Sequence, residues 1–187
     1  EFRRVLFRSA IKRFDALLAE FPEGAYVERA EVWRSIAQVR QFCEGSTPAW
    51  NDALTAVGEL TGRYKQAPFF KERAKDVADL MVRIAAGLAA QAKKSASADD
   101  LAKSQEALRL LESTFTGDQR PTDRIAETLT LMDQARFEIE KASIRRAAIA
   151  SMDQAIAAKE PIRVFAEHRK LYHRYADLKD DREVRTR

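Results

Sequence analysis

Apolar residues recur at intervals of three and four along most of this chain, which is the spacing of one face of an α-helix. Residues 10–37 show the pattern twice, on either side of a turn at 21–24. Pro22 cannot extend the hydrogen-bond ladder of a helix, and Gly24 supplies the backbone freedom that a tight reversal needs. Two helices joined by so short a turn pack as antiparallel neighbours. This stretch therefore predicts a helical hairpin.

The next part of the chain repeats this alternation of amphipathic helix and short break. A third helix is predicted at roughly 48–63, with Thr47 as its N-cap. A fifth lies between polar breaks at 93–98 and 116–121, with Ser97 or Ser95 as its cap. Between them, after a break at 65–68, the fourth helix carries the most regular apolar stripe of the chain: Phe70, Ala74, Val77, Met81, Ile84 and Leu88.

The C-terminal part predicts one long helix and a hairpin. Residues 123–158 contain neither glycine nor proline, which predicts an uninterrupted helix about 50 Å long at 1.5 Å per residue. A last hairpin begins near Glu160-Pro161, runs through Phe165, Leu171 and Tyr175, and turns at 176–177. The whole pattern predicts an all-α fold of about seven or eight helices in antiparallel pairs.

Two local patterns predict how these helices pack. Gly58 and Gly62 lie within the third helix, where each is expected to admit a close neighbour. Before four breaks a leucine is followed one turn later by an aromatic residue that we expect to fill the junction between helices: Leu17/Phe21, Leu60/Tyr64, Leu111/Phe115 and Leu171/Tyr175. The unequal intervals between these pairs indicate a degenerate array rather than a strict solenoid.

The first hairpin resembles a tetratricopeptide repeat. Its first helix is similar to the second helix of such a repeat at Ala10, Phe14, Leu17, Leu18 and Pro22. After the turn, Trp33 and the pair Ile36-Ala37 resemble the start of the next repeat, although Arg40 stands where the family has a tyrosine. The resemblance implies antiparallel hairpins stacked as an α-solenoid fragment, and the alternative is a generic antiparallel helix pair. The long helix at 123–158 departs from the family.

Most of residues 10–183 also resembles the helical region N-terminal to the propeller in bacterial PQQ-binding-like β-propeller repeat proteins. This second resemblance is carried by packing motifs at 21–22, 26–30, 36–40, 47–50, 84–88, 168–171 and 175–178. The propeller itself is not in this sequence, and no cofactor is predicted. The resemblance implies a cell-envelope or periplasmic location, which the sequence alone does not give.

Residues 1–9, EFRRVLFRS, resemble a short-read sequencing adapter translated in frame. The alternative is a natural basic helix start. We treat these residues as an artefact, exclude them from the fold prediction, and expect the sequence to begin inside a repeat whose first helix is missing. We divide the remainder into tetratricopeptide-like hairpins at 10–94 and a continuing helical array at 95–187 with the long helix and the terminal hairpin.

Charge and composition narrow the class of function. The formal net charge is +4 over 187 residues, and residues 1–9 contribute three arginines against one glutamate, which leaves only +2 for the rest. Basicity therefore does not argue for nucleic acid. Hydrophobic residues at 45% and charged residues at 33% are typical of a soluble helical protein. No stretch is long and apolar enough to span a membrane.

Residues with possible chemistry do not form a catalytic constellation. His168 and His173 are five positions apart, whereas a metal pair on a helix is spaced by three or four. The single Cys43 is interpreted as a small buried residue rather than a nucleophile. Four carboxylates are interpreted as helix-start residues and two tryptophans as packing residues: Asp99, Asp100, Asp180, Asp181, Trp33 and Trp50.

Two basic clusters are interpreted as solvated faces with ion pairs. The first comprises Arg136, Lys141, Arg145 and Arg146, with Glu127, Glu138 and Glu140 interspersed. The second comprises Arg163, Arg169, Lys170 and Arg174, balanced by Glu167, Asp177, Asp180 and Asp181. A nucleic-acid track would need cations on one side alone.

The sequence therefore predicts no catalytic, cofactor-binding or metal site. We expect a non-enzymatic scaffold or interaction module, part of a larger bacterial protein, with a protein or peptide partner and no nucleic-acid partner. The alternative is a structural spacer or assembly arm of a cell-envelope protein whose β-propeller domain is missing.

Overall fold

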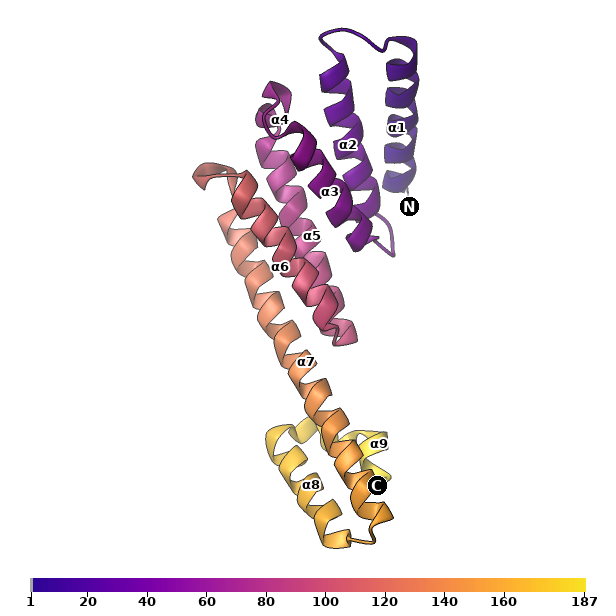
Figure 1. Ribbon diagram of the computed structural model, residues 1–187, viewed down its shortest axis with the longest axis vertical. Coiled ribbons are helices and arrows are strands. Elements are labelled where there is room, and N and C mark those ends of the chain that lie inside the picture. The colour runs from indigo at the N-terminus through magenta and orange to yellow at the C-terminus, as the bar shows by residue number, and fades with distance from the viewer. Residues whose placement is uncertain (1) are drawn as a thin grey trace. The chain divides into compact units, whose positions relative to one another are not determined.

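The chain is helical throughout the part that the computed structural model describes, residues 2–187 (Figure 1). Over these residues there is no strand, which confirms the all-α prediction. The α-helices are α1 (Phe2–Glu20), α2 (Val27–Cys43), α3 (Trp50–Tyr64), α4 (Pro68–Glu72), α5 (Ala74–Ser95), α6 (Ala98–Thr114), α7 (Thr122–Ala157), α8 (Pro161–Arg174) and α9 (Arg182–Arg185). Two 3-10 helices are η1 (Gly117–Gln119) and η2 (Ala176–Asp180).

The chain forms two compact units. The first ends at Ala135 and the second covers Arg136–Arg187, so α7 contributes residues to both. The boundary that we predicted between 94 and 95 falls at the C-terminal end of α5, inside the first unit. Each unit is described separately below.

The first hairpin forms as predicted, and its first helix is longer than expected. Helix α1 begins at Phe2, so residues 2–9, which we excluded, continue it; Glu1 lies outside the described residues. At the turn, the Tyr26 hydroxyl donates a hydrogen bond to the Glu23 carbonyl at 2.9 Å. The ring of Phe21 is 47% exposed and Leu17 is also exposed, so this aromatic does not fill a helix junction as expected. The reason is that α1 packs mainly on α2, and none of its side chains from residue 3 to residue 20 is fully buried.

The core of the first unit is centred on α5. Every member of the predicted stripe from Phe70 to Leu88 is buried, which confirms it. The helix that we predicted as continuous breaks at Arg73, so the stripe is shared between α4 and α5. Helix α5 buries eleven residues in all and contacts α2, α3 and α6. Many of the buried residues are alanines, and these small side chains let several helices approach the same backbone.

Successive helices of the first unit lie antiparallel, and alternate helices also meet (Figure 1). Helix α1 packs on α2, α2 on α3, and α5 on α6. In addition α2 contacts α5, and α3 contacts α6. Two layers result, one containing α2 and α5, the other α3 and α6.

The predicted caps are partly correct. The Ser97 hydroxyl accepts a hydrogen bond from the Asp100 backbone N–H at 3.2 Å, which confirms it as the N-cap of α6. The Thr47 prediction is wrong, because α3 begins at Trp50 with Ala49 as its N-cap. The Ala49 N–H instead donates to the Phe42 carbonyl, which closes the loop against the end of α2.

The close helix approach occurs at a different glycine from the two that we predicted. A Cβ added at Gly58 or Gly62 would meet nothing within 4 Å, so neither admits a neighbour. A Cβ added at Gly87 in α5 would lie 2.3 Å from the ring of Trp50 in α3. Trp50 is therefore a packing residue between hairpins, as expected, and Gly87 makes room for it.

The other three leucine–aromatic pairs are buried as predicted. Phe115 stacks on Phe70 with ring centroids 5.9 Å apart. The Tyr64 ring is buried while its hydroxyl donates to a carboxylate oxygen of Glu31 at 2.8 Å. In the second unit, Tyr175 is buried and meets the Phe137 ring edge-on at 5.7 Å.

The second unit has its own small core. Helix α7 runs uninterrupted for 36 residues, as predicted. Its C-terminal part packs with α8, η2 and α9 around Ala148, Ile149, Met152, Ala155, Val164, Leu171, Tyr175, Leu178 and Val184. Phe165, which we placed in the apolar run of the last hairpin, is instead exposed. It lies one position beyond the buried Val164 and therefore on the outer side of α8.

We expect Gly87→Ala to destabilise the first unit by about 1–3 kcal/mol, because either the Trp50 ring or the α5 backbone must move. Gly62→Ala is the matched control in an open helical position, and it should stabilise the unit by about 0.5–1 kcal/mol. Urea unfolding followed by circular dichroism measures both. Equal shifts of the two midpoints in the same direction would contradict the Trp50–Gly87 contact.

Candidate interaction groove

The first unit contains an open groove of about 500 Å³. Helices α1, α2, α5 and the start of α7 supply its lining: Arg3, Leu6, Phe7, Arg40, Glu44, Asp76, Asp79, Leu80, Arg83 and Arg124. Seven of these ten side chains are charged, with four arginines and three carboxylates. The groove is thus a polar surface of mixed sign with an apolar wall from α1.

Helical spacing brings these side chains to one face of each helix. On α5 the residues Asp76, Leu80 and Arg83 follow at intervals of four and three, while α2 supplies Arg40 and, at its C-cap, Glu44. Residues at these intervals lie above one another on a helix. Because α2 and α5 are in contact, their two faces form one continuous surface.

Arg83 joins the two helices at the centre of the groove. One guanidinium nitrogen, Nη1, lies 2.8 Å from Glu44 Oε1, and Nη2 donates to the Cys43 carbonyl at 2.9 Å. Helix C-terminal carbonyls lack partners within the helix, so this contact also completes the end of α2. The hydrogen bond from Arg83 holds the pKa of the Glu44 carboxyl below its usual value. Glu44 is therefore an anion at neutral pH.

The start of α7 closes another side of the groove. Arg124 Nη1 lies 3.0 Å from Asp79 Oδ1 of α5. Further along both helices, Lys93 Nζ donates to Gln134 Oε1 at 2.8 Å. Asp79 and Arg124 lie near the N-terminal ends of α5 and α7, whereas Lys93 and Gln134 lie further along the same two helices. The two helices are therefore parallel in this part of the chain.

Arg40 is a cation of the groove that lies on α2. It is half-buried, and among the described residues no carboxylate or carbonyl pairs with its guanidinium. Seven residues before it on the same face of α2, Trp33 packs against Phe69 at 5.8 Å between ring centroids, and the Arg73 guanidinium lies 4.8 Å from the Trp33 centroid. Trp33 is therefore a packing residue, as expected, with a cation–π contact on its face.

Cys43 lies behind the groove and is unreactive. Its side chain is buried, and burial raises the pKa of the thiol to about 11. A thiol is a poor nucleophile at neutral pH when so little of it is thiolate. Its interpretation as a small buried residue agrees with this placement.

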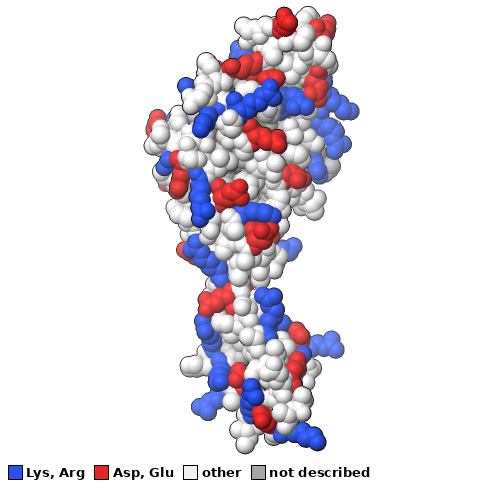
Figure 2. Space-filling model, viewed as in Figure 1, with Lys and Arg blue, Asp and Glu red and all other residues white. Residues whose placement is uncertain are grey.

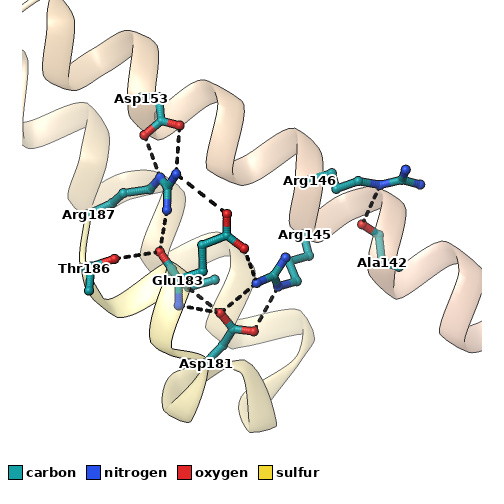
Figure 3. A network of polar contacts seen from close by, with 9 residues as sticks. Ala142, Arg145, Arg146, Asp153, Asp181, Glu183, Thr186 and Arg187 are labelled. Atoms are coloured by element: carbon teal, nitrogen blue, oxygen red, sulfur yellow. Dashed lines mark hydrogen bonds and ion pairs between the residues drawn. The ribbon is translucent and has the colours of Figure 1, made fainter. Parts of the chain in front are cut away.

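Arg145 of the first basic cluster forms ion pairs within the second unit (Figure 3). Arg145 donates to both Asp181 oxygens, at 2.9 and 3.0 Å, and to Glu183 at 2.6 Å. Asp181 also caps α9 by accepting from the Glu183 and Val184 N–H groups. Arg187 completes the network with a bidentate contact to Asp153 of α7. The cluster ties α9 to α7, as the ion-pair interpretation predicts.

Several of the remaining singled-out charges also have partners nearby, whereas Arg169 has no ion-pair partner among the described residues. In the second unit Lys141 pairs with Asp177, Arg174 with Glu140, Arg163 with Glu160, and Lys170 with Glu167. In α6 Asp99 pairs with Lys103, and the buried Asp100 accepts from Gln91. Arg146 donates to the Ala142 carbonyl. Figure 2 shows the described Lys and Arg side chains interspersed with Asp and Glu on the face in view, without a one-sided basic track.

The two histidines do not converge. His168 is half-buried beside Tyr172, with ring centroids 5.3 Å apart, and its Nε2 atom is buried without a hydrogen-bond partner. His173 is exposed. Within residues 2–187, no three His, Cys, Asp or Glu side chains gather into a set that suits a metal ion. None of the described helices is both long and apolar enough to cross a bilayer.

No known protein family, curated protein or solved structure matches this chain. The resemblances drawn from its motifs therefore stay predictions. The groove residues were not singled out from the sequence as a site, except Arg40 as a departure from the repeat pattern. One sequence pattern could have indicated the groove. Between residues 76 and 83, charged residues recur at intervals of three and four on a helix face next to the apolar stripe.

The Arg145 network predicts that α9 loosens in acid. The hydrogen bond from Arg145 holds the pKa of Asp181 below its usual value. The stabilisation is therefore present above the unfolded pKa near 3.9 and is lost as the pH falls through the lower folded value. We expect the hydrogen-exchange protection factor of the Val184 amide to be constant from about pH 7 to 5 and to fall below about pH 4.

Asp181→Asn keeps a capping side chain and removes the charge. It should lower that protection about two- to fivefold at pH 7, as for a partly exposed ion pair, and flatten the acid response. Asp180→Asn, at an exposed neighbouring position, is the matched control and should follow the wild type. An unchanged acid response in Asp181→Asn would show that another group controls the docking of α9.

Proposed function

We propose that this chain is a non-enzymatic protein-interaction module in which tetratricopeptide-like hairpins of the first unit present the groove to a peptide or another domain. The observation that carries the proposal is the groove between α2, α5 and α7. Its lining comes from α1, α2, α5 and the start of α7, so the groove depends on how the hairpins pack.

The packing order of the first unit supports a repeat-like array. Helix α2 contacts α5 and α3 contacts α6, so alternate helices are neighbours as well as successive ones. Stacked hairpins of this kind build a continuous surface from equivalent helices, and such surfaces bind extended segments. The contacts from Asp79 to Arg124 and from Lys93 to Gln134 extend the same layer to α7.

The chemistry of the groove favours binding over catalysis. Its charged side chains largely pair with one another, as Arg83 does with Glu44 and Arg124 with Asp79. General acid–base catalysis needs a group whose pKa lies near the working pH. The pKa of Glu44 is lowered and that of Cys43 is about 11, so both lie away from neutrality. The unpaired Arg40 and the exposed Leu6 instead offer one charged and one apolar contact to a ligand.

The alternative role, a spacer or assembly arm of a cell-envelope protein, would need no ligand in the groove. The length of α7 favours the spacer role, because 36 uninterrupted helical residues correspond to about 54 Å. Peptide binding distinguishes the two roles.

The test is selection of peptides from a random displayed library against the whole chain, followed by affinity measurement with charge-reversal variants. Arg40→Glu should weaken the selected peptides about tenfold, because a half-buried cation in the groove would become an anion. Arg109→Glu is the matched control, an exposed arginine of α6 outside the groove, and it should leave the affinity within about twofold.

Two outcomes would contradict the proposal. Selected peptides that bind both variants equally well would use another surface. A library that yields no binder above background would favour the spacer role. Circular dichroism of each variant should match the wild type, since both side chains lie at the surface.

A further inference from the structure

The outer face of α8 exposes large apolar side chains that the fold does not use. Ile162 is 85% exposed and Phe165 is 73% exposed, the two highest values among the large apolar residues described. They lie three residues apart, so they share one face of the helix. The opposite face, with Val164 and Leu171, is buried in the core of the second unit. Ile162 and Phe165 are therefore exposed on a helix whose opposite face is packed in the core.

Two shallow hollows flank Phe165. One, of about 620 Å³, is lined by Ile162, Phe165, Ala166, Arg169, Lys170 and His173. The other, of about 400 Å³, lies on the side of the α7–α8 turn and includes Ile156, itself 48% exposed, and His168. Phe165 lines both, so it forms a ridge between two depressions. If another helix packed across this ridge, its side chains would fit into the hollows on the two sides.

The charge around this ridge is positive on balance, because the second hollow has one carboxylate, Glu160, beside Lys159 and Arg187. The first hollow contains Arg169 and Lys170 and no carboxylate. Helix α8 as a whole carries four arginines and lysines against one glutamate. Among the described residues Arg169 has no ion-pair partner, and Lys159, at the other end of the ridge, is exposed and likewise unpaired. The other cations of α8 pair with carboxylates: Arg163 with Glu160, Lys170 with Glu167 and Arg174 with Glu140.

We propose that the outer face of α8 is a docking surface for an acidic amphipathic helix of a partner protein. The apolar stripe of the partner helix would cover Ile162 and Phe165 and fill the two hollows. Its flanking carboxylates would pair with Arg169 and Lys159, which have no ion-pair partner among the described residues. The proposal concerns the second unit alone and does not depend on ligand binding in the groove of the first.

Charge favours an acidic helix over a second copy of the chain as the partner that binds this surface. A two-fold pairing of α8 with itself would set each basic rim against the same basic rim, which is unfavourable. The area also argues against a permanent dimer, since stable interfaces bury about 1,200–2,000 Å² in total and the apolar part here rests on three side chains. An acidic helix satisfies both the apolar ridge and the cations.

The experiment uses a fluorescently labelled helical peptide of about 15 residues, with leucines at helical spacing and glutamates flanking them. A control peptide has the same leucines and lysines in place of the glutamates. Fluorescence anisotropy with the whole chain, at about 0.05 M and 0.5 M salt, measures both. The acidic peptide should bind more tightly than the basic one by at least about tenfold at low salt, and this preference should shrink at high salt.

Variants at exposed positions locate the binding. Phe165→Ser should weaken the acidic peptide about tenfold, and Leu129→Ser, at a 48% exposed apolar position of the first unit, should leave it within about twofold. Arg169→Glu should weaken it and lower the salt dependence, and Arg182→Glu, an exposed arginine of α9, is its control. Unchanged circular dichroism verifies that each variant folds.

Several results would overturn the proposal. Equal binding of the two peptides, or binding insensitive to Phe165→Ser, would mean that the α8 face does not select an acidic helix. Dimerisation in sedimentation equilibrium that Phe165→Ser abolishes would assign the face to a second copy. Binding to phosphatidylserine-containing vesicles that Phe165→Ser abolishes, without peptide binding, would assign it to a membrane surface. Failure of the library selection at the groove would leave these results unaffected.

Discussion

The close packing of three helices around α5 is the constraint on which the first unit depends. Ala78, Ala85 and Ala89 have no exposed surface, and Gly87 makes room for the ring of Trp50. Small side chains bring the neighbouring backbones so near that a buried polar group finds its partner across the contact: the Ser104 hydroxyl of α6 donates to the Ala85 carbonyl at 2.6 Å. Any larger side chain at these positions would separate the hairpins, since protein interiors have few voids to absorb it.

The same constraint places the charged residues of the groove. Because α5 buries its stripe against α3 and α6, its remaining face with Asp76, Asp79 and Arg83 must lie beside α2 and the start of α7. The ion pairs from Arg83 to Glu44 and from Arg124 to Asp79 follow from that placement. The second unit uses charge differently. Its core is small, and the Arg145 network holds the last turn of the chain on α7. Ile162 and Phe165 on the outer side of α8 stay exposed.

The sequence predicted the elements well and the contacts between them less well. Apolar periodicity located the stripe from Phe70 to Leu88 and the long helix α7, because burial at helical spacing leaves a strong local pattern. The prediction that Gly58 and Gly62 admit a close neighbouring helix was wrong. The local sequence does not show which glycine faces a neighbour, because that depends on how separate helices pack together. Phe21 and Phe165 look like core residues in the sequence, yet both are exposed, because no described element packs over them. The groove joins residues from 3 to 124, and no local pattern reports such a combination.

Native-state hydrogen exchange of the whole chain tests the central claim, that α5 is the buried centre of the first unit. The packing predicts that the amides of residues 77–89 exchange most slowly within residues 2–135, because they need the largest opening of that unit. Helix α1, in which no side chain of residues 3–20 is fully buried, should exchange fastest among the long helices. Exchange of α5 as fast as that of α1 would contradict the account. The hairpins would then not be held together by α5, and the groove that depends on their packing would lose its basis.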